Sequence, residues 1–390
     1  MVAKRRRAEL VAARKAAGYT QEGLAAALYV DRATVVHWEA GRHVPQPYLW
    51  PKLARLLGVT KERLQELLAD VTITQPKQSG RMSYVLEHPS WVDLVAVAYL
   101  HERIRQLDEE YDRAPSTALL GSAAQAHGQV RFLRENAASA RVRKALCGVE
   151  AESATFMGQL VWDVSQRRDH VAPVTYLDEA VAAAQQIRDP CAEAYATLRK
   201  SFVALYGEKD PLKGLTLARE AAEVATAASS ALTGLSLLHV AEGYAMTGDI
   251  KGCEAALKQA EVQVNRVDAD DVAAPYYTIN EFNRLAGSCY LFLDLPDRAE
   301  PILRTTVRAF STKQKSQAIP LGNLTLSLLR QRKLDEAAAM MHRTIDTVEL
   351  TRGGGGLNLA FAAGRELRQW RQERWVQDIN DRLLALMAAS

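Results

Sequence analysis

Apolar residues recur at helical spacing along the first 68 residues, in short stretches that end at glycine or proline. This spacing predicts helices that each carry one apolar face. Gly18, Gly41 and Gly58 stand where such helices end, because glycine accepts the left-handed conformation found at helix C-termini. We therefore expect five short helices, over residues 6–17, 21–28, 32–40, 48–57 and 61–68.

Only Tyr29, Val30 and Asp31 separate the second and third predicted helices, which is enough for one tight turn. Thr20, Asp31 and Thr60 can each cap a helix, because a short polar side chain there accepts a hydrogen bond from a backbone N–H group. We expect the two helices to cross and share a small core. Its residues are Leu24, Ala25, Leu28, Val30, Val35 and Trp38.

Residues 70–90 lose helical periodicity and contain prolines, glycine and serine, which predicts a linker. From residue 91 onward the helical pattern returns, rich in alanine and leucine. Polar turns recur there at intervals of 41, 39, 48 and 36 residues, namely Arg168-Asp169, Lys209-Asp210, Gly248-Asp249, Pro296-Asp297 and Arg332-Lys333. Each turn separates two amphipathic stretches, so we expect helical hairpins that bury their apolar faces by stacking.

The fold expected is therefore all-α, with an N-terminal five-helix domain and a C-terminal superhelix of helical hairpins. We place the first domain at 1–69, the linker at 70–90 and the repeat domain at 91–390, with the clearest repeats at about 151–345. Residues 1–68 hold twelve basic and six acidic residues, whereas the whole chain has a net charge of only +3. A basic N-terminal domain on a mildly acidic body suits a phosphate-bearing partner.

Several classes of protein are disfavoured by the sequence. The four cysteines form no CxxC pair, so we expect neither a zinc site nor a redox site. We expect buried thiols in a reducing cytoplasm instead. No apolar run is long enough to span a membrane, and the basic N-terminus is followed by no apolar stretch of a secretory signal. No catalytic motif is present, and the glycines at 353–356 lack the lysine of a phosphate-binding loop. We expect a cytoplasmic protein that is not an enzyme and needs no metal or cofactor, with the glycines as a flexible connector.

The third predicted helix shows its first turn to the outside. An α-helix fits the major groove of DNA, and its N-terminal residues then reach the base edges. Arg32 can donate two hydrogen bonds to guanine, Thr34 can contact thymine or a phosphate, and His37 can donate to guanine. Phosphate contacts are also expected at the start of the preceding helix. The predicted DNA-binding residues are Gln21, Arg32, Ala33, Thr34, His37 and Arg42, with Arg5, Arg6, Arg7 and His43 as further backbone contacts.

Residues 6–68 resemble the helix-turn-helix of phage repressors, the Cro/C1 or XRE type. The matching positions are Arg14, Gly18, Thr20, Gln21, Glu22, Leu24, Ala25, Leu28, Val30, Arg32, Thr34, Val35, Trp38, Glu39, Gly41, Arg42 and Pro45. Two positions depart from the family pattern. Tyr29 replaces the usual glycine of the turn, and Gly23 replaces a common glutamate. The resemblance implies that the residues named above face operator DNA.

Residues 237–260 resemble a tetratricopeptide repeat, with weaker copies over 151–345. Such repeats coil into a superhelix whose concave face comes from the first helix of each hairpin, and that face can bind an extended peptide. The candidate ligand-binding residues are Arg199, Lys200, His239, Glu242, Asn283, Arg284 and Asn323.

The two modules together resemble peptide-sensing transcription regulators of Gram-positive bacteria and actinomycetes. The resemblance implies a homodimer that binds double-stranded operator DNA and senses a signalling peptide or small molecule. The alternative is a protein-interaction adaptor in which the repeats recruit a partner and DNA binding is secondary. A third possibility is an enzyme without a recognisable motif.

Overall fold

The computed structural model describes residues 8–28, 30–40, 45, 49–60, 63–64, 67–68, 78–310, 314–351 and 354–388. The chain divides into two compact units, Met1–Glu87 and His88–Ser390, and each is described by itself. All secondary structure among these residues is helical, so the predicted all-α fold class is confirmed.

The first unit contains four short helices in the order predicted, α1 (Ala8–Ala16), α2 (Gln21–Leu28), α3 (Arg32–Glu39) and α4 (Trp50–Leu57), followed by α6 (Gln78–Glu87). Of the fifth predicted helix, the structure describes residues 63–64 and 67–68, which are helical. These elements surround a core that includes five of the six predicted core residues, and Val30 packs against it. The buried five are Leu24, Ala25, Leu28, Val35 and Trp38.

The predicted helix ends of this unit are largely confirmed. Gly18 and Gly58 have φ angles of 78° and 67°, the left-handed conformation that glycine allows. Thr20 Oγ1 accepts a hydrogen bond from the Gly23 N–H at 2.9 Å, and Thr60 Oγ1 accepts one from Arg63 at 3.1 Å. The prediction for Asp31 was wrong, because Asp31 occupies the N-cap position of α3 but its side chain makes no capping bond. Gly41 and Tyr29 lie outside the described residues.

Helix α6 lies inside the segment predicted to be a linker without helical periodicity. Met82 and Val85 are buried and stand three residues apart, as on one face of a helix. This short pattern is not evident in the sequence, because serine, glycine and proline disfavour a helix and occur in the same segment, at Ser79, Gly80 and Pro89. The domain boundaries themselves stay a prediction.

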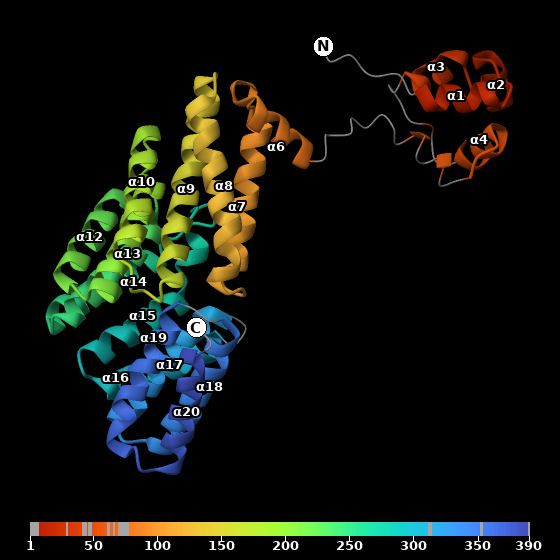
Figure 1. Ribbon diagram of the computed structural model, residues 1–390. Helices are drawn as coiled ribbons and strands as arrows, with labels where there is room; N and C mark the ends of the chain where they lie inside the picture. Colours follow the sequence, from red (N-terminus) through yellow and green to blue (C-terminus); the bar gives the residue numbers. More distant parts are fainter. Residues whose placement is uncertain are drawn as a thin grey trace. The chain divides into compact units, whose positions relative to one another are not determined.

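The second unit is a row of antiparallel helices (Figure 1). After the 3-10 turn Pro89–Trp91, three long helices open it, α7 (Leu94–Glu110), α8 (Ser116–Asn136) and α9 (Ala140–Val164). The following helices are α10 (Val171–Ile187), α11 (Pro190–Phe202) with a π-helical continuation (Val203–Glu208), α12 (Pro211–Ala225), α13 (Ser230–Met246), α14 (Ile250–Val264) and α15 (Ile279–Phe292), with the 3-10 turn Ala274–Tyr276 before α15. The last are α16 (Pro296–Ala309), α17 (Gln314–Arg330), α18 (Leu334–Thr351), α19 (Gly354–Glu366), the 3-10 turn Leu367–Trp370 and α20 (Arg374–Ala388).

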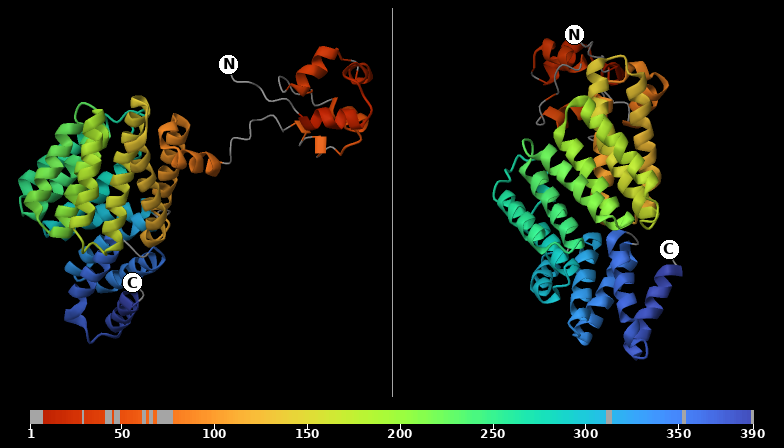
Figure 2. Two further views of the ribbon diagram at one scale, coloured as in Figure 1. Left: turned by 45° about the horizontal axis from the view of Figure 1, so that its top comes forward. Right: turned by 90° about the vertical axis from the view of Figure 1, so that its left-hand side faces the viewer.

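The hairpins stack in chain order into a superhelix, and α17 to α20 pack together at its C-terminal end (Figure 2). Two apolar clusters run through the stack, one over α11 to α15 and one over α15 to α20. Alanine is frequent in both clusters, and its small side chain lets helices approach closely. Cys147, Cys253 and Cys289 are buried thiols and Cys191 is half-buried.

The five predicted turns each fall at a helix-to-helix junction, although the fourth lies slightly earlier than predicted, at Asp294 rather than at Pro296. Each junction contains a residue in the left-handed conformation, namely Arg167, Lys209, Gly248, Asp294 and Arg332. After the last four of these, the next residue's N–H bonds back to a carbonyl of the finished helix, as from Asp249 to Tyr244 at 2.9 Å. This geometry ends one helix and starts the next within a few residues.

The prediction of a flexible connector at 353–356 was wrong for residues 354–356, and Gly353 lies outside the described residues. Helix α19 begins at Gly354, and Gly355 and Gly356 lie in its first turn. A Cβ atom on Gly356 would lie 2.3 Å from the Cβ of Ala318 in α17. These glycines therefore serve close helix packing, a use that composition alone does not distinguish from flexibility.

Candidate nucleic-acid interface

Helix α3 has a buried face and an exposed face. Val35 and Trp38 are buried in the core, and Arg32 and Ala33 are exposed in the first turn. Thr34 and His37 are half-buried beside them. The structure therefore brings four of the six predicted DNA-binding residues together on α3.

Arg32 pairs with a carboxylate of the neighbouring helix. Its Nε lies 2.8 Å from Glu22 Oε1, and the two side chains are 62% and 64% exposed. Such an exposed pair contributes about 0–1 kcal/mol, because water competes for both partners. A base edge or a phosphate can therefore replace Glu22 at little cost.

Gln21, at the start of α2, is held by a buried ion pair. Arg14 Nε lies 2.6 Å from Glu39 Oε1, and both side chains are almost completely buried. The Gln21 amide nitrogen donates to Glu39 Oε2 at 2.6 Å, and Arg14 also donates to the Tyr19 carbonyl at 2.6 Å. This network ties the ends of α1, α2 and α3 together. The sequence predicts that Gln21 faces DNA but does not indicate the Arg14–Glu39 pair that orients it.

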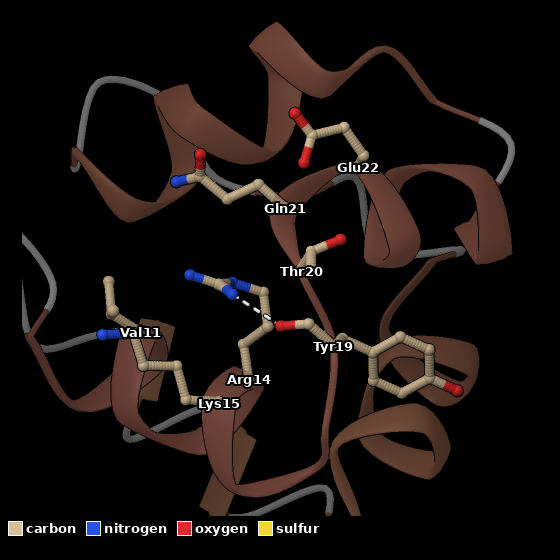
Figure 3. A pocket seen from close by; sticks show the side chains of 7 residues that line it. All are labelled: Val11, Arg14, Lys15, Tyr19, Thr20, Gln21 and Glu22. Carbon is tan, nitrogen blue, oxygen red and sulfur yellow. Dashed lines mark hydrogen bonds between the residues drawn. The ribbon is translucent and has the colours of Figure 1, made fainter.

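A hollow opens next to this network (Figure 3). Gln21 and Glu22 stand on one rim, and Val11, Arg14 and Lys15 stand on the other. The start of a helix carries partial positive charge and attracts a phosphate, and the exposed Lys15 adds a full positive charge. Lys15 is not among the residues that the sequence predicts to contact DNA. Arg42, His43, Arg5, Arg6 and Arg7 lie outside the described residues.

The candidate ligand-binding residues all lie on first helices of hairpins, as predicted. They are distributed over α11 (Arg199, Lys200), α13 (His239, Glu242), α15 (Asn283, Arg284) and α17 (Asn323).

Most of these candidates already have partners within the protein. His239 Nδ1 lies 2.8 Å from Glu242 Oε2, and the Tyr206 hydroxyl contacts both side chains. Burial lowers the pKa of His239 and raises that of Tyr206 well above its ordinary value, so both are neutral near pH 7. Tyr206 could not be predicted from the sequence, because its contact with α13 depends on how successive hairpins stack.

The remaining candidates differ in what they contact. Asn323 is buried and donates to Ser288 Oγ at 2.7 Å, and Arg284 Nε lies 2.7 Å from Glu281. Lys200 pairs with Asp178 of α10 at 2.7 Å, and Asn283 is half-buried.

Arg199 has a different environment. Its guanidinium lies 5.0 Å and 5.3 Å from the ring centres of Tyr195 and Phe202, and it donates to the Tyr195 hydroxyl at 2.5 Å. Cation–π contacts of this kind stabilise a half-buried guanidinium.

The first unit, which we call the head, has the arrangement of a helix-turn-helix, and the second unit is a superhelix of helical hairpins. Residues 10–64 match the helix-turn-helix family model, which confirms the resemblance seen in the sequence. No curated protein sequence matches the chain. Among the described residues, no helix is both long and apolar enough to cross a membrane.

Three solved structures are similar to the chain, each at low sequence identity and with a TM-score below 0.5. A Rap protein complexed with competence and sporulation factor has 10% identity and a TM-score of 0.46, over 75% of this chain and 98% of that chain. PlcR of Bacillus thuringiensis, in complex with the peptide PapR7 and DNA, has 13% identity and a TM-score of 0.37, over 78% and 94%. The PrgX/iCF10 complex has 10% identity and a TM-score of 0.35, over 89% and 97%.

Proposed function

We propose that this protein is a sequence-specific, DNA-binding transcription regulator whose α3 lies in the major groove. The observation that carries the proposal is the division of α3 into a face buried by Val35 and Trp38 and an opposite, exposed first turn with Arg32 and Ala33. In a helix-turn-helix, the N-terminal residues of the second helix reach the base edges.

Each residue of the interface has a role in this proposal. Arg32 leaves Glu22 and donates to a guanine, and Thr34 and His37 contact the neighbouring bases. Gln21 and the start of α2 bind a phosphate, which fixes the position of the head on the duplex. Arg42, which follows α3 in the chain, contacts a phosphate of the DNA backbone.

The repeat domain is the regulatory part of the proposal. It forms a homodimer and binds a signalling peptide or small molecule along the first helices of its hairpins. A dimer presents two α3 helices to half-sites about 34 Å apart, one turn of DNA. The ligand changes DNA affinity only where it binds the free and DNA-bound arrangements unequally.

The direct test is titration of the purified full chain with a labelled duplex of random sequence at two salt concentrations. Binding that rests on about 6–10 phosphate contacts weakens roughly 10³- to 10⁵-fold between about 50 and 200 mM salt. Arg32→Ala is expected to weaken binding at the lower salt concentration. Arg308→Ala removes an exposed arginine of α16 in the other unit and is the matched control.

Two results would contradict the proposal. One is absence of binding to any duplex at low ionic strength. The other is equal binding by the Arg32→Ala and Arg308→Ala proteins, which would favour the adaptor over the regulator.

A further inference from the structure

The corner between α7 and α8 contacts a helix about 200 residues further along the chain. The Lys315 N–H donates to the Asp112 carbonyl at 3.1 Å. The Ser316 N–H and hydroxyl both donate to Asp112 Oδ1, at 2.9 and 2.6 Å. These bonds join the first helices of the repeat domain to the first turn of α17. The superhelix is therefore closed by a contact between elements that are not neighbours in the stack.

A buried lysine completes this contact. Lys315 is 6% exposed, its Nζ donates to Ser116 Oγ at 3.1 Å, and it lies 3.8 Å from the ring centre of Tyr111. Ser116 and Tyr111 in turn donate to Asp163 at the end of α9. We call the five residues Tyr111, Asp112, Ser116, Lys315 and Ser316 the clasp.

The bonds between the α7–α8 corner and α17 are polar, although Tyr111 also packs edge-on against Phe156 within its own side of the clasp. Neighbouring hairpins, in contrast, meet through apolar clusters. Removing a charge such as that of Lys315 from water costs about as much as its attraction to buried partners returns. Polar contacts of this kind resemble transient interfaces, because they separate without exposing an apolar core. The clasp can therefore open while the apolar stack of hairpins stays intact.

A proline lies next to the clasp within α17. Pro320 has no backbone N–H, so the helix lacks the bond that would otherwise run from residue 320 to the Ser316 carbonyl. Proline inside a helix is a common site of bending. The first turn of α17, which carries Lys315 and Ser316, is therefore held to the rest of the helix by one backbone hydrogen bond fewer than in a helix without proline.

The same corner borders the candidate ligand-binding residues. Asp108 and Tyr111 lie within electrostatic range of Arg199 in α11. A movement of the corner therefore changes the surroundings of Arg199.

We propose that the clasp is a conformational switch, in which the first turn of α17 bends at Pro320 and releases the α7–α8 corner. Opening widens the superhelix and changes access to the first helices of the hairpins. The consequence for ligand binding rests on the proposed function, whereas the opening itself is a property of the chain alone.

Hydrogen–deuterium exchange of the full chain, without DNA or ligand, tests the switch. The amides of Lys315 and Ser316 are hydrogen-bonded, yet we expect them to exchange at least about 100-fold faster than the buried amides of α13, because local opening precedes global unfolding. Asp112→Ala removes the acceptor side chain and is expected to speed this exchange about tenfold further. Pro320→Ala restores the missing helix bond and is expected to slow it.

Controls separate the switch from a general loss of stability. Glu254→Ala breaks an exposed ion pair with Arg298 between α14 and α16, and it should leave exchange at the clasp unchanged. Ser316→Ala is a milder variant, because it removes one hydroxyl group. It is also expected to speed exchange of the clasp amides, and it replaces Asp112→Ala if that protein fails to fold. Exchange of the clasp amides at the rate of α13 in every variant would overturn the proposal, because the clasp would then open only by unfolding. DNA binding takes no part in this experiment, so its failure leaves the proposed function standing.

Discussion

Two glutamates of the head are each paired with an arginine, but their surroundings differ. Glu39 pairs with Arg14 and is 3% exposed, whereas Glu22 pairs with Arg32 and is 64% exposed. Removing one partner of a buried pair leaves an uncompensated charge, which costs about 3–5 kcal/mol. Removing one partner of an exposed pair costs at most about 1 kcal/mol.

We therefore predict that Glu39→Ala destabilises the head severely and that Glu22→Ala changes its stability little. Hydrogen exchange of the buried Val35 amide, measured against urea, gives the free energy of unfolding of this unit. A double variant with Arg14→Met and Glu39→Leu should recover much of the loss, because apolar residues can replace a buried ion pair. Equal effects of Glu39→Ala and Glu22→Ala would refute this account of the head.

At the scale of residues, the sequence predicted the exposed face of α3 but not the ion pair that holds the helix in place. Arg32, Ala33 and Thr34 follow from helical periodicity once Val35 and Trp38 are identified as core residues. The pairing of Arg14 with Glu39 depends on the packing of α1 against α3. A charge that tertiary packing buries looks like a surface charge in the sequence.

The ends of the helices depend on residues in the left-handed conformation. Gly248 has a φ angle of 79°, and a Cβ atom added there would meet no atom within 4 Å. We predict that Gly248→Ala lowers the free energy of unfolding by about 1–2 kcal/mol, because the left-handed conformation is strained for alanine.

Gly121 is the matched control. It lies within α8, and a Cβ atom there also meets nothing within 4 Å. Gly121→Ala should raise stability by up to about 1 kcal/mol, because alanine is the better helix former. Urea unfolding followed by helical circular dichroism measures both. A change of the same sign in the two variants would count against the assigned turn geometry.

A buried carboxyl between α8, α9 and α10 makes stability depend on pH. The pKa of Glu150 is raised to about 7, because burial and the nearby Glu179 carboxylate together outweigh the lowering effect of Arg134. The folded state therefore holds this proton more tightly than the unfolded chain, so stability falls as the pH rises from about 4.5 to about 7. The loss is on the order of 3 kcal/mol.

Glu150→Gln keeps the shape of the side chain without the charge, and it should flatten this part of the pH profile. Glu135→Gln changes an exposed glutamate of α8 and should leave the profile as it is. Urea unfolding at a series of pH values gives the free energy of unfolding of the wild type and both variants as a function of pH. Identical slopes for the wild-type and Glu150→Gln proteins would disprove the assignment to Glu150.

At the scale of elements, most helices and turns could be predicted because periodicity and turn residues are local signals. The failures concern residues that serve two purposes. Gly356 has the composition of a connector but permits close packing of α19 on α17. Asp31 occupies a capping position without making the bond, because position alone does not fix a side-chain rotamer.

For the whole molecule, the sequence predicted a helix-turn-helix head and an array of helical hairpins. It did not predict the clasp between Asp112 and Ser316, which are 204 residues apart. That contact depends on the pitch of the superhelix, which is the sum of small rotations between successive hairpins. No local pattern contains that sum.

The central claim is that two α3 helices of a dimer recognise bases on DNA. Selection of bound duplexes from a random-sequence pool, carried out with the purified full chain, tests it most directly. We predict enrichment of one two-fold symmetric motif whose half-site centres lie about one helical turn apart, and loss or change of that motif with Arg32→Ala. A pool that stays random, or an unaltered motif selected by the Arg32→Ala protein, would contradict the claim.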